Sequence, residues 1–110
     1  MNNNNVMPTL FVSHGAPDIL LSRDEASDAI RNLSDSVPRP KAIVVISAHW
    51  TDDPVGITDM KILDTIHDFG GFQPELYQQQ YPAKGDAVLT LHIASLLQQK
   101  GINSQRLSNR

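Results

Sequence analysis

Two histidines stand directly after apolar stretches of the chain. His14 follows "TLFVS" at residues 9–13, and His49 follows "AIVVISA" at residues 42–48. Imidazole nitrogens bind transition metals, and the chain contains no cysteine, so a metal site here would use imidazole and carboxylate ligands. The residue types therefore make His14 and His49 candidate metal ligands.

The stretches before these two histidines have the composition of buried strands. Each is continuously apolar, which is typical of strands in a parallel sheet that is covered on both faces. Functional groups gather beyond the carboxyl ends of parallel strands, and neighbouring strands lie about 4.8 Å apart. We therefore expect His14 and His49 to converge on one metal ion, Zn²⁺ or Fe²⁺. Two hydrogen-bonded surface histidines stay open as the alternative, because the pair does not form a compact ligand motif.

A third histidine, His67, lies in "TIHDFGGF" at residues 65–72, a segment with the glycines of a loop. Such a histidine can donate or accept a proton in a pocket, with the Asp68 carboxylate orienting the ring. The alternative is a loop histidine whose hydrogen bonds are satisfied by that neighbouring carboxylate. His92, the remaining histidine, flanks the apolar stripe of a predicted helix and is interpreted as structural.

The elements that must position these side chains alternate between strand and helix. Ser22 and Glu25 have the spacing of a capping box, and apolar residues recur at helical intervals from there to Val37, before two prolines. Further along, the pattern predicts a strand at 55–58, a short helix at 74–80, a helix from Asp86 to Lys100 and the start of a strand at 102–107. The order predicts an α/β fold: a largely parallel sheet with flanking helices.

Length and composition limit the remaining possibilities. The 110 residues accommodate one domain, which we expect to comprise a disordered lead at 1–7 and an α/β domain at 8–110. The net charge of −3 gives no electrostatic support for binding nucleic acid or membrane. No apolar run reaches the roughly 18 residues of a membrane helix, and the start lacks the features of a signal peptide. We therefore expect a cytoplasmic protein with no nucleic-acid or membrane partner.

Four segments, in this order and at these intervals, carry a resemblance to a known family: "LFVSHGAP", "PRPKAIVVISAHW", "TIHDFGGF" and "YPAKGD". They resemble the amino-terminal part of the class III extradiol dioxygenases, and within that family the 4,5-DOPA dioxygenase branch. The resemblance implies an α/β fold with one divalent metal ion, Fe²⁺ or Zn²⁺, acting as a Lewis acid. It also implies a catechol substrate similar to DOPA, whose ring is cleaved beside its hydroxyls with O₂.

The resemblance also implies roles for individual residues. It places the first two metal ligands of the family on His14 and His49, and it places His67 in a segment near the pocket but not among the metal ligands, so His67 stays the candidate catalytic residue for proton transfer. The remaining ligands of the family fall beyond the last residue of this chain. We therefore expect an apparently truncated, amino-terminal portion of such an enzyme. The alternatives are an inactive remnant or binding module of the same fold, and a metal-dependent hydrolase. Surface left open by truncation would favour self-association.

Overall fold

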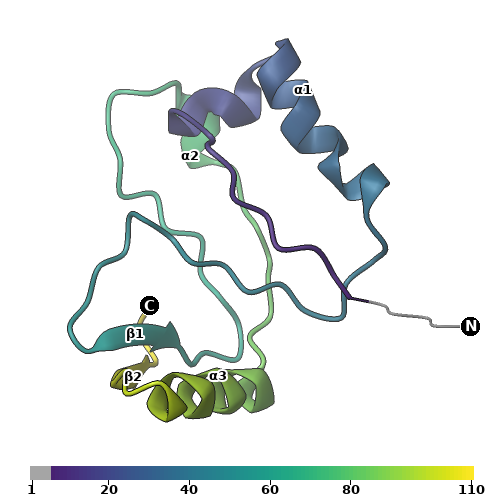
Figure 1. The fold of residues 1–110 in the computed structure, drawn as a ribbon. Coiled ribbons are helices and arrows are strands. Elements are labelled where there is room, and N and C mark those ends of the chain that lie inside the picture. Colours follow the sequence, from purple (N-terminus) through teal and green to yellow (C-terminus); the bar gives the residue numbers. More distant parts are fainter. Residues whose placement is uncertain (1–5) are drawn as a thin grey trace, which may run out of the picture. The chain divides into compact units, whose positions relative to one another are not determined.

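The computed structural model describes residues 6–110, which form two units. The first unit comprises residues 6–43 and 67–79, and the second comprises residues 44–66 and 80–110. Most of the predicted lead, residues 1–7, lies outside the described residues. The ribbon in Figure 1 labels the main elements. In chain order they are the 3₁₀ helix η1 (Pro17–Leu21), α1 (Glu25–Arg31), the 3₁₀ helix η2 (Asn32–Ser36), β1 (Val55–Thr58), α2 (Pro74–Tyr77), α3 (Ala87–Gln99) and β2 (Ser104–Leu107).

The first unit contains the short helices η1, α1, η2 and α2. The capping box of α1 uses Asp24 and Ser27 rather than the predicted Ser22 and Glu25. The Asp24 carboxylate accepts the Ser27 N–H at 2.8 Å, and the Ser27 hydroxyl oxygen accepts the Asp24 N–H at 3.0 Å. Ser22 is engaged elsewhere, because its hydroxyl donates to the Asp18 carbonyl at 3.2 Å.

Leu76 is the hydrophobic centre of the first unit. Its side chain lies on α2, is only 1% exposed, and is the one fully buried large apolar side chain among the described residues. Because α2 contacts η1, this burial joins the segment after His67 to the segment after His14. Removing such a side chain from its packing typically costs about 2–5 kcal/mol of stability.

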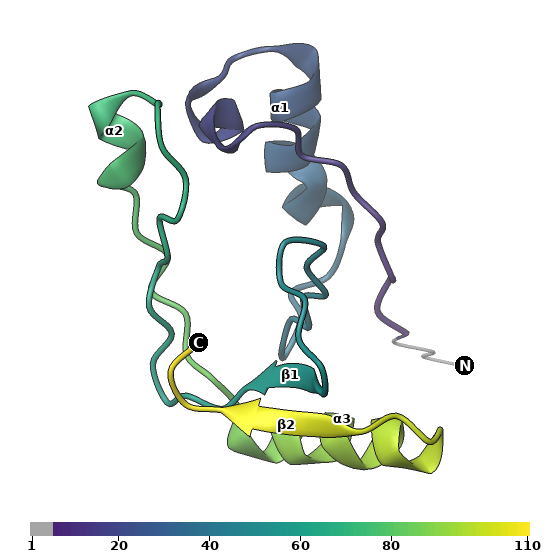
Figure 2. The same ribbon diagram turned by 90° about the vertical axis from the view of Figure 1, so that its left-hand side faces the viewer.

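The second unit is a strand–helix–strand crossover. β1 and β2 pair in parallel, with Val55 opposite Ser104 and Thr58 opposite Leu107. Figure 2 shows the two strands side by side along α3, and both strands contact this helix. The Thr90 hydroxyl on α3 donates to the Thr58 carbonyl at 3.1 Å, which fixes the helix to the end of β1. The predicted α/β fold with a parallel sheet and helices is confirmed.

The ends of α3 follow the sequence prediction closely. The Asp86 carboxylate accepts the Leu89 N–H at 2.9 Å, as an N-cap does. Beyond the other end, Gly101 has φ +75°, a left-handed conformation that favours glycine after a helix. Among residues 6–110, no helix has the length and apolar character needed to cross a bilayer.

The predictions of buried strands at 9–13 and 42–48 are wrong for this chain. Within residues 6–110, only Val55–Thr58 and Ser104–Leu107 form strands. The apolar side chains of the two stretches are instead exposed, as in Phe11 (104%) and Ile46 (95%). A strand forms only where a neighbour pairs with its backbone N–H and carbonyl groups. Among the described residues such pairing is found between β1 and β2 and at an isolated bridge between Ile62 and Lys84, and the stretches 9–13 and 42–48 take part in neither.

Candidate functional site

His14 lies at a turn of the backbone at the start of the first unit's helices. Gly15, which follows it, has φ +68°, a conformation that side chains with a Cβ rarely adopt. The chain then enters η1 after Ala16. The His14 side chain is exposed and lies three residues before η1.

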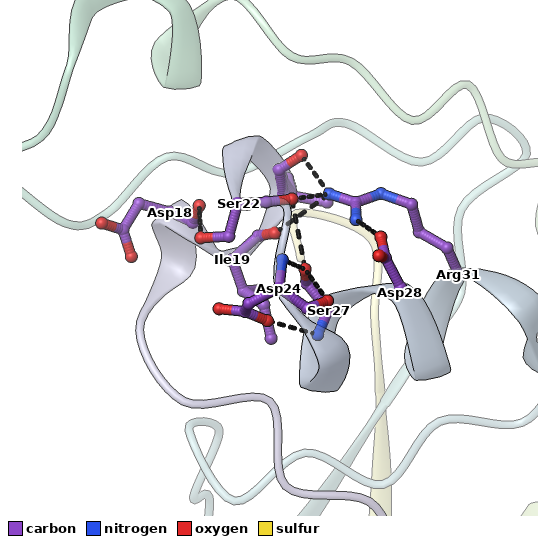
Figure 3. A network of polar contacts seen from close by, with 8 residues as sticks. Asp18, Ile19, Ser22, Asp24, Ser27, Asp28 and Arg31 are labelled. Carbon is purple, nitrogen blue, oxygen red and sulfur yellow. Dashed lines mark hydrogen bonds and ion pairs between the residues drawn. The ribbon is translucent and has the colours of Figure 1, made fainter.

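Arg31 holds η1 against α1, as Figure 3 shows. Its Nη2 donates to three backbone carbonyls, those of Ile19 (3.3 Å), Leu20 (3.0 Å) and Ser22 (2.6 Å). Its Nη1 also donates to the Asp28 carboxylate at 3.1 Å. The exposed ion pair adds little stability by itself, but the three carbonyl contacts fix the end of η1. The segment that follows His14 is therefore anchored by a side chain that sequence reasoning did not single out.

His49 lies in a turn of the second unit that Ser47 stabilises. The Ser47 hydroxyl oxygen accepts the His49 N–H at 3.1 Å, and the Ser47 carbonyl accepts the Trp50 N–H at 3.4 Å. The Trp50 indole N–H donates to Asp52 at 2.7 Å, and its ring lies so close to Gly56 of β1 that a Cβ there would be 2.6 Å from it. The His49 backbone is thus placed by a turn and by the packing of its neighbour against the sheet.

The structure places the two predicted metal ligands in different units. His14 belongs to the first and His49 to the second, so their convergence stays a prediction. Their imidazole groups are suitable donors for Zn²⁺ or Fe²⁺. However, the part of the chain that the structure describes holds no group of three or more His, Asp or Glu side chains that could bind a metal ion. The two histidines therefore have the right kind of donor atom for such a metal ion. Two ligands are too few to complete a metal site.

His67 lies in a half-buried aromatic cluster of the first unit. Its Nε2 is 2.8 Å from the Gln79 carbonyl oxygen, which is the partner the structure gives that nitrogen. The Phe69 ring lies edge-on to His67 with centroids 6.1 Å apart, and the Tyr77 ring lies 6.4 Å away. The Tyr77 hydroxyl oxygen accepts the Phe72 N–H at 3.3 Å. Sequence reasoning could not identify Gln79 as a partner, because a backbone carbonyl leaves no signal in residue types.

Comparison with known proteins defines the family of this chain. A model for the catalytic LigB subunit of aromatic ring-opening dioxygenase matches residues 8–109. The chain belongs to this family. This confirms the resemblance that the four sequence segments indicate.

Particular relatives are also similar over most of the chain. The 4,5-DOPA dioxygenase extradiol of Escherichia coli K12 is 44% identical over 91 residues, which cover 83% of this chain and 34% of the relative. The Beta vulgaris protein of the same name is 38% identical over 103 residues, covering 91% and 38%. Dioxygenase tasH of Hapsidospora irregularis is 32% identical over 106 residues, covering 86% and 33%. The chain therefore spans about a third of the length of the curated relatives it matches.

Proposed function

We propose that the natural polypeptide containing these residues is a ring-cleaving extradiol dioxygenase that acts on a catechol similar to DOPA and uses O₂. The observation that carries this proposal is the family match across residues 8–109, together with relatives named 4,5-DOPA dioxygenase extradiol. His14 and His49 are the two ligands that this chain contributes to one Zn²⁺ or Fe²⁺ ion. Residues 6–110 hold no group of three or more His, Asp or Glu side chains that could bind a metal ion, so these two histidines do not complete a site by themselves.

His67 is the proposed proton-transfer residue. Its half-buried ring lies among aromatic side chains, a setting with the apolar surfaces against which a catechol ring packs. A neutral imidazole has one ring nitrogen with a free lone pair, so this side chain is of a type that can accept a hydroxyl proton. In this proposal the chain's own residues orient the substrate and move a proton.

The second candidate function is a non-catalytic module of the same fold. It is supported by the incomplete ligand set and by the exposed apolar side chains at 9–13 and 42–48. Such exposed apolar surface favours self-association. Sedimentation of the purified polypeptide, combined with the metal analysis described next, distinguishes this module from an enzyme.

The test uses the natural polypeptide purified from its source, loaded anaerobically with Fe²⁺ and then given L-DOPA and O₂. We expect a coloured ring-opened product, O₂ consumption and one bound metal per site. His14→Ala and His49→Ala should each lower metal content and activity by at least tenfold, on the scale of about 10–100-fold seen for groups that support metal sites. His92→Ala, which alters an exposed histidine of α3, is the matched control. An inactive wild-type protein contradicts the dioxygenase proposal, and unchanged metal content in both variants contradicts the ligand assignment.

A further inference from the structure

Trp50, the only tryptophan of the chain, has contacts on its polar edge and on its face. Its indole Nε1–H donates to the Asp52 carboxylate at 2.7 Å. The Arg110 guanidinium lies over the ring, with its Cζ 5.7 Å from the ring centroid, in a cation–π arrangement. All three residues belong to the second unit. Trp50 is half-buried, although residues 41–49 and 51–55 on either side of it are exposed.

Gly56 of β1 leaves open the space that the Trp50 ring occupies. A Cβ at Gly56 would lie 2.6 Å from Cζ2 and 3.1 Å from Cε2 of the ring, and 2.9 Å from an Asp52 carboxylate oxygen. Gly56 is not among the described glycines with positive φ, so its backbone conformation does not require a glycine. Within a strand, a glycine often marks the close approach of another group. Here that group is the indole ring.

His49 lies between this packed ring and a hydrogen-bonded turn. The strand beneath the ring is held by its pairing with β2 and by its contacts with α3. On the other side of His49, the Ser47 hydroxyl oxygen accepts the His49 N–H at 3.1 Å, and the Ser47 carbonyl accepts the Trp50 N–H at 3.4 Å. The backbone of His49 is thus connected on both sides to groups that are fixed within the second unit.

We propose that Trp50 is a positioning residue for His49: its ring, packed in the space that Gly56 leaves open, holds the turn at residues 47–50 on β1. This inference rests on the proposed function, in which His49 binds the metal ion. A ligand whose backbone is already held on a sheet loses less conformational freedom on binding than a ligand in a loose turn. Trp50 therefore acts on metal affinity through the backbone of His49 and is not itself a ligand.

The first measurement needs no metal ion and no assay of activity. Backbone ¹⁵N relaxation of the purified polypeptide gives an order parameter for the His49 amide, about 0.85 for a rigid backbone and below about 0.6 for a flexible one. We expect the rigid value in the wild type and the flexible value in Trp50→Ala, while the Asp59 amide, which donates to the Leu107 carbonyl, stays rigid in both. Tyr81→Ala, which removes an exposed aromatic ring from the same unit, is the matched control. A flexible His49 amide in the wild type, or a rigid one in Trp50→Ala, would overturn the inference.

Gly56→Ala tests the same packing from the side of the strand, and it keeps the inference testable if Trp50→Ala does not fold. The added Cβ should displace the ring into water, so the emission of the only tryptophan should shift to longer wavelength and the His49 amide should become flexible. Gly70→Ala is the control, because its Cβ would meet nothing within 4 Å. In the Trp50→Ala background the ring is absent, so adding Gly56→Ala should change the His49 amide no further. Unchanged emission with a rigid His49 amide in Gly56→Ala would show that the inference is wrong.

Metal affinity separates positioning from a purely structural role. Competition with a chromophoric chelator gives the Kd for Zn²⁺ of the natural polypeptide under conditions in which every variant is folded. We expect the Kd to rise about tenfold in Trp50→Ala, at the low end of the about 10–100-fold seen for groups that support metal ligands. Trp50→Phe keeps an aromatic ring for Gly56 and should bind Zn²⁺ almost as tightly as the wild type. An unchanged Kd in Trp50→Ala would overturn the positioning role and leave the dioxygenase proposal intact, whereas an unchanged Kd in His49→Ala would contradict the ligand assignment and the inference with it.

Discussion

β1 and the stretch at 42–48 are separated by a few residues of chain, yet their environments differ. Val55–Thr58 pairs in parallel with β2, contacts α3 and has three half-buried residues. Residues 42–48 are more apolar, but Val45 is 78% exposed and Ile46 is 95% exposed. The stretch at 9–13, which precedes His14, resembles 42–48 in this respect. Pairing, rather than apolar content, distinguishes the region that forms a sheet.

This difference has a consequence for the candidate metal ligands. β1 is fixed by a partner strand, by the Thr90 hydroxyl on its last carbonyl and by the Trp50 ring against Gly56. His14 and His49 follow stretches that form no strand with any other described residue, although Arg31 fixes η1 after His14 and Ser47 stabilises the turn at His49. Neither stretch that precedes a candidate ligand therefore forms the strand that the sequence predicts.

The largest expected effect comes from Gly85, next to α3 in the second unit. A Cβ at Gly85 would collide with the Met60 backbone carbonyl, which no side-chain movement can relieve. We expect Gly85→Ala to lower the free energy of unfolding by about 3 kcal/mol, and chemical denaturation followed by circular dichroism measures it. Gly70→Ala is the control, because its Cβ would meet nothing within 4 Å. Equal costs at both positions would show that the close approach at Gly85 is unimportant.

Amide hydrogen exchange compares the paired and exposed regions directly. The amides of Val55 and Asp59 donate across the sheet to the carbonyls of Asn103 and Leu107, at 3.3 and 2.8 Å. We expect protection of such sheet amides to exceed that of residues 42–48 by about a hundredfold, because exchange there requires the strand pair to open. Comparable protection in residues 42–48 would mean that this stretch is paired in solution and that the contrast is wrong.

The features that sequence predicts well are those that depend on nearby residues. α3 and its two ends follow from Asp86, an apolar stripe and Gly101, all within one segment. The strands at 9–13 and 42–48 fail because pairing depends on a distant partner that residue types do not reveal. In the site, sequence identifies the histidines but not their surroundings. The Gln79 carbonyl is a backbone group, and the carbonyl partners of Arg31 likewise carry no sequence signal.

A matched pair of substitutions tests the same contrast at the level of single side chains. Ile57 lies half-buried in β1, whereas Ile46 is exposed. Threonine keeps the β-branched shape, so Ile57→Thr should cost about 1 kcal/mol of stability through lost apolar burial. Ile46→Thr should stay within about 0.5 kcal/mol of wild type, as surface changes usually do. Thermal unfolding of the two variants measures both costs, and a larger loss for Ile46→Thr would reveal a partner for residues 42–48.

The smallest expected effect is a pH response confined to α1. The Ser27 N–H, and then the Ser27 hydroxyl, hold the pKa of Asp24 below its ordinary value of 3.8. A carboxyl whose pKa is lowered in the folded state stabilises that state fully above its ordinary value, and this contribution disappears as pH falls through the lowered pKa. Below about pH 3.8, we therefore expect the amide chemical shifts of α1 to report unfolding at a lower denaturant concentration than the amide chemical shifts of β1.

The control is Asp24→Asn, which keeps an oxygen that can cap the helix but has no titrating group. In this variant the difference between α1 and β1 should vanish. If the variant shows the same acid transition as the wild type, another group is responsible, and the pH response does not distinguish the capped helix from the sheet.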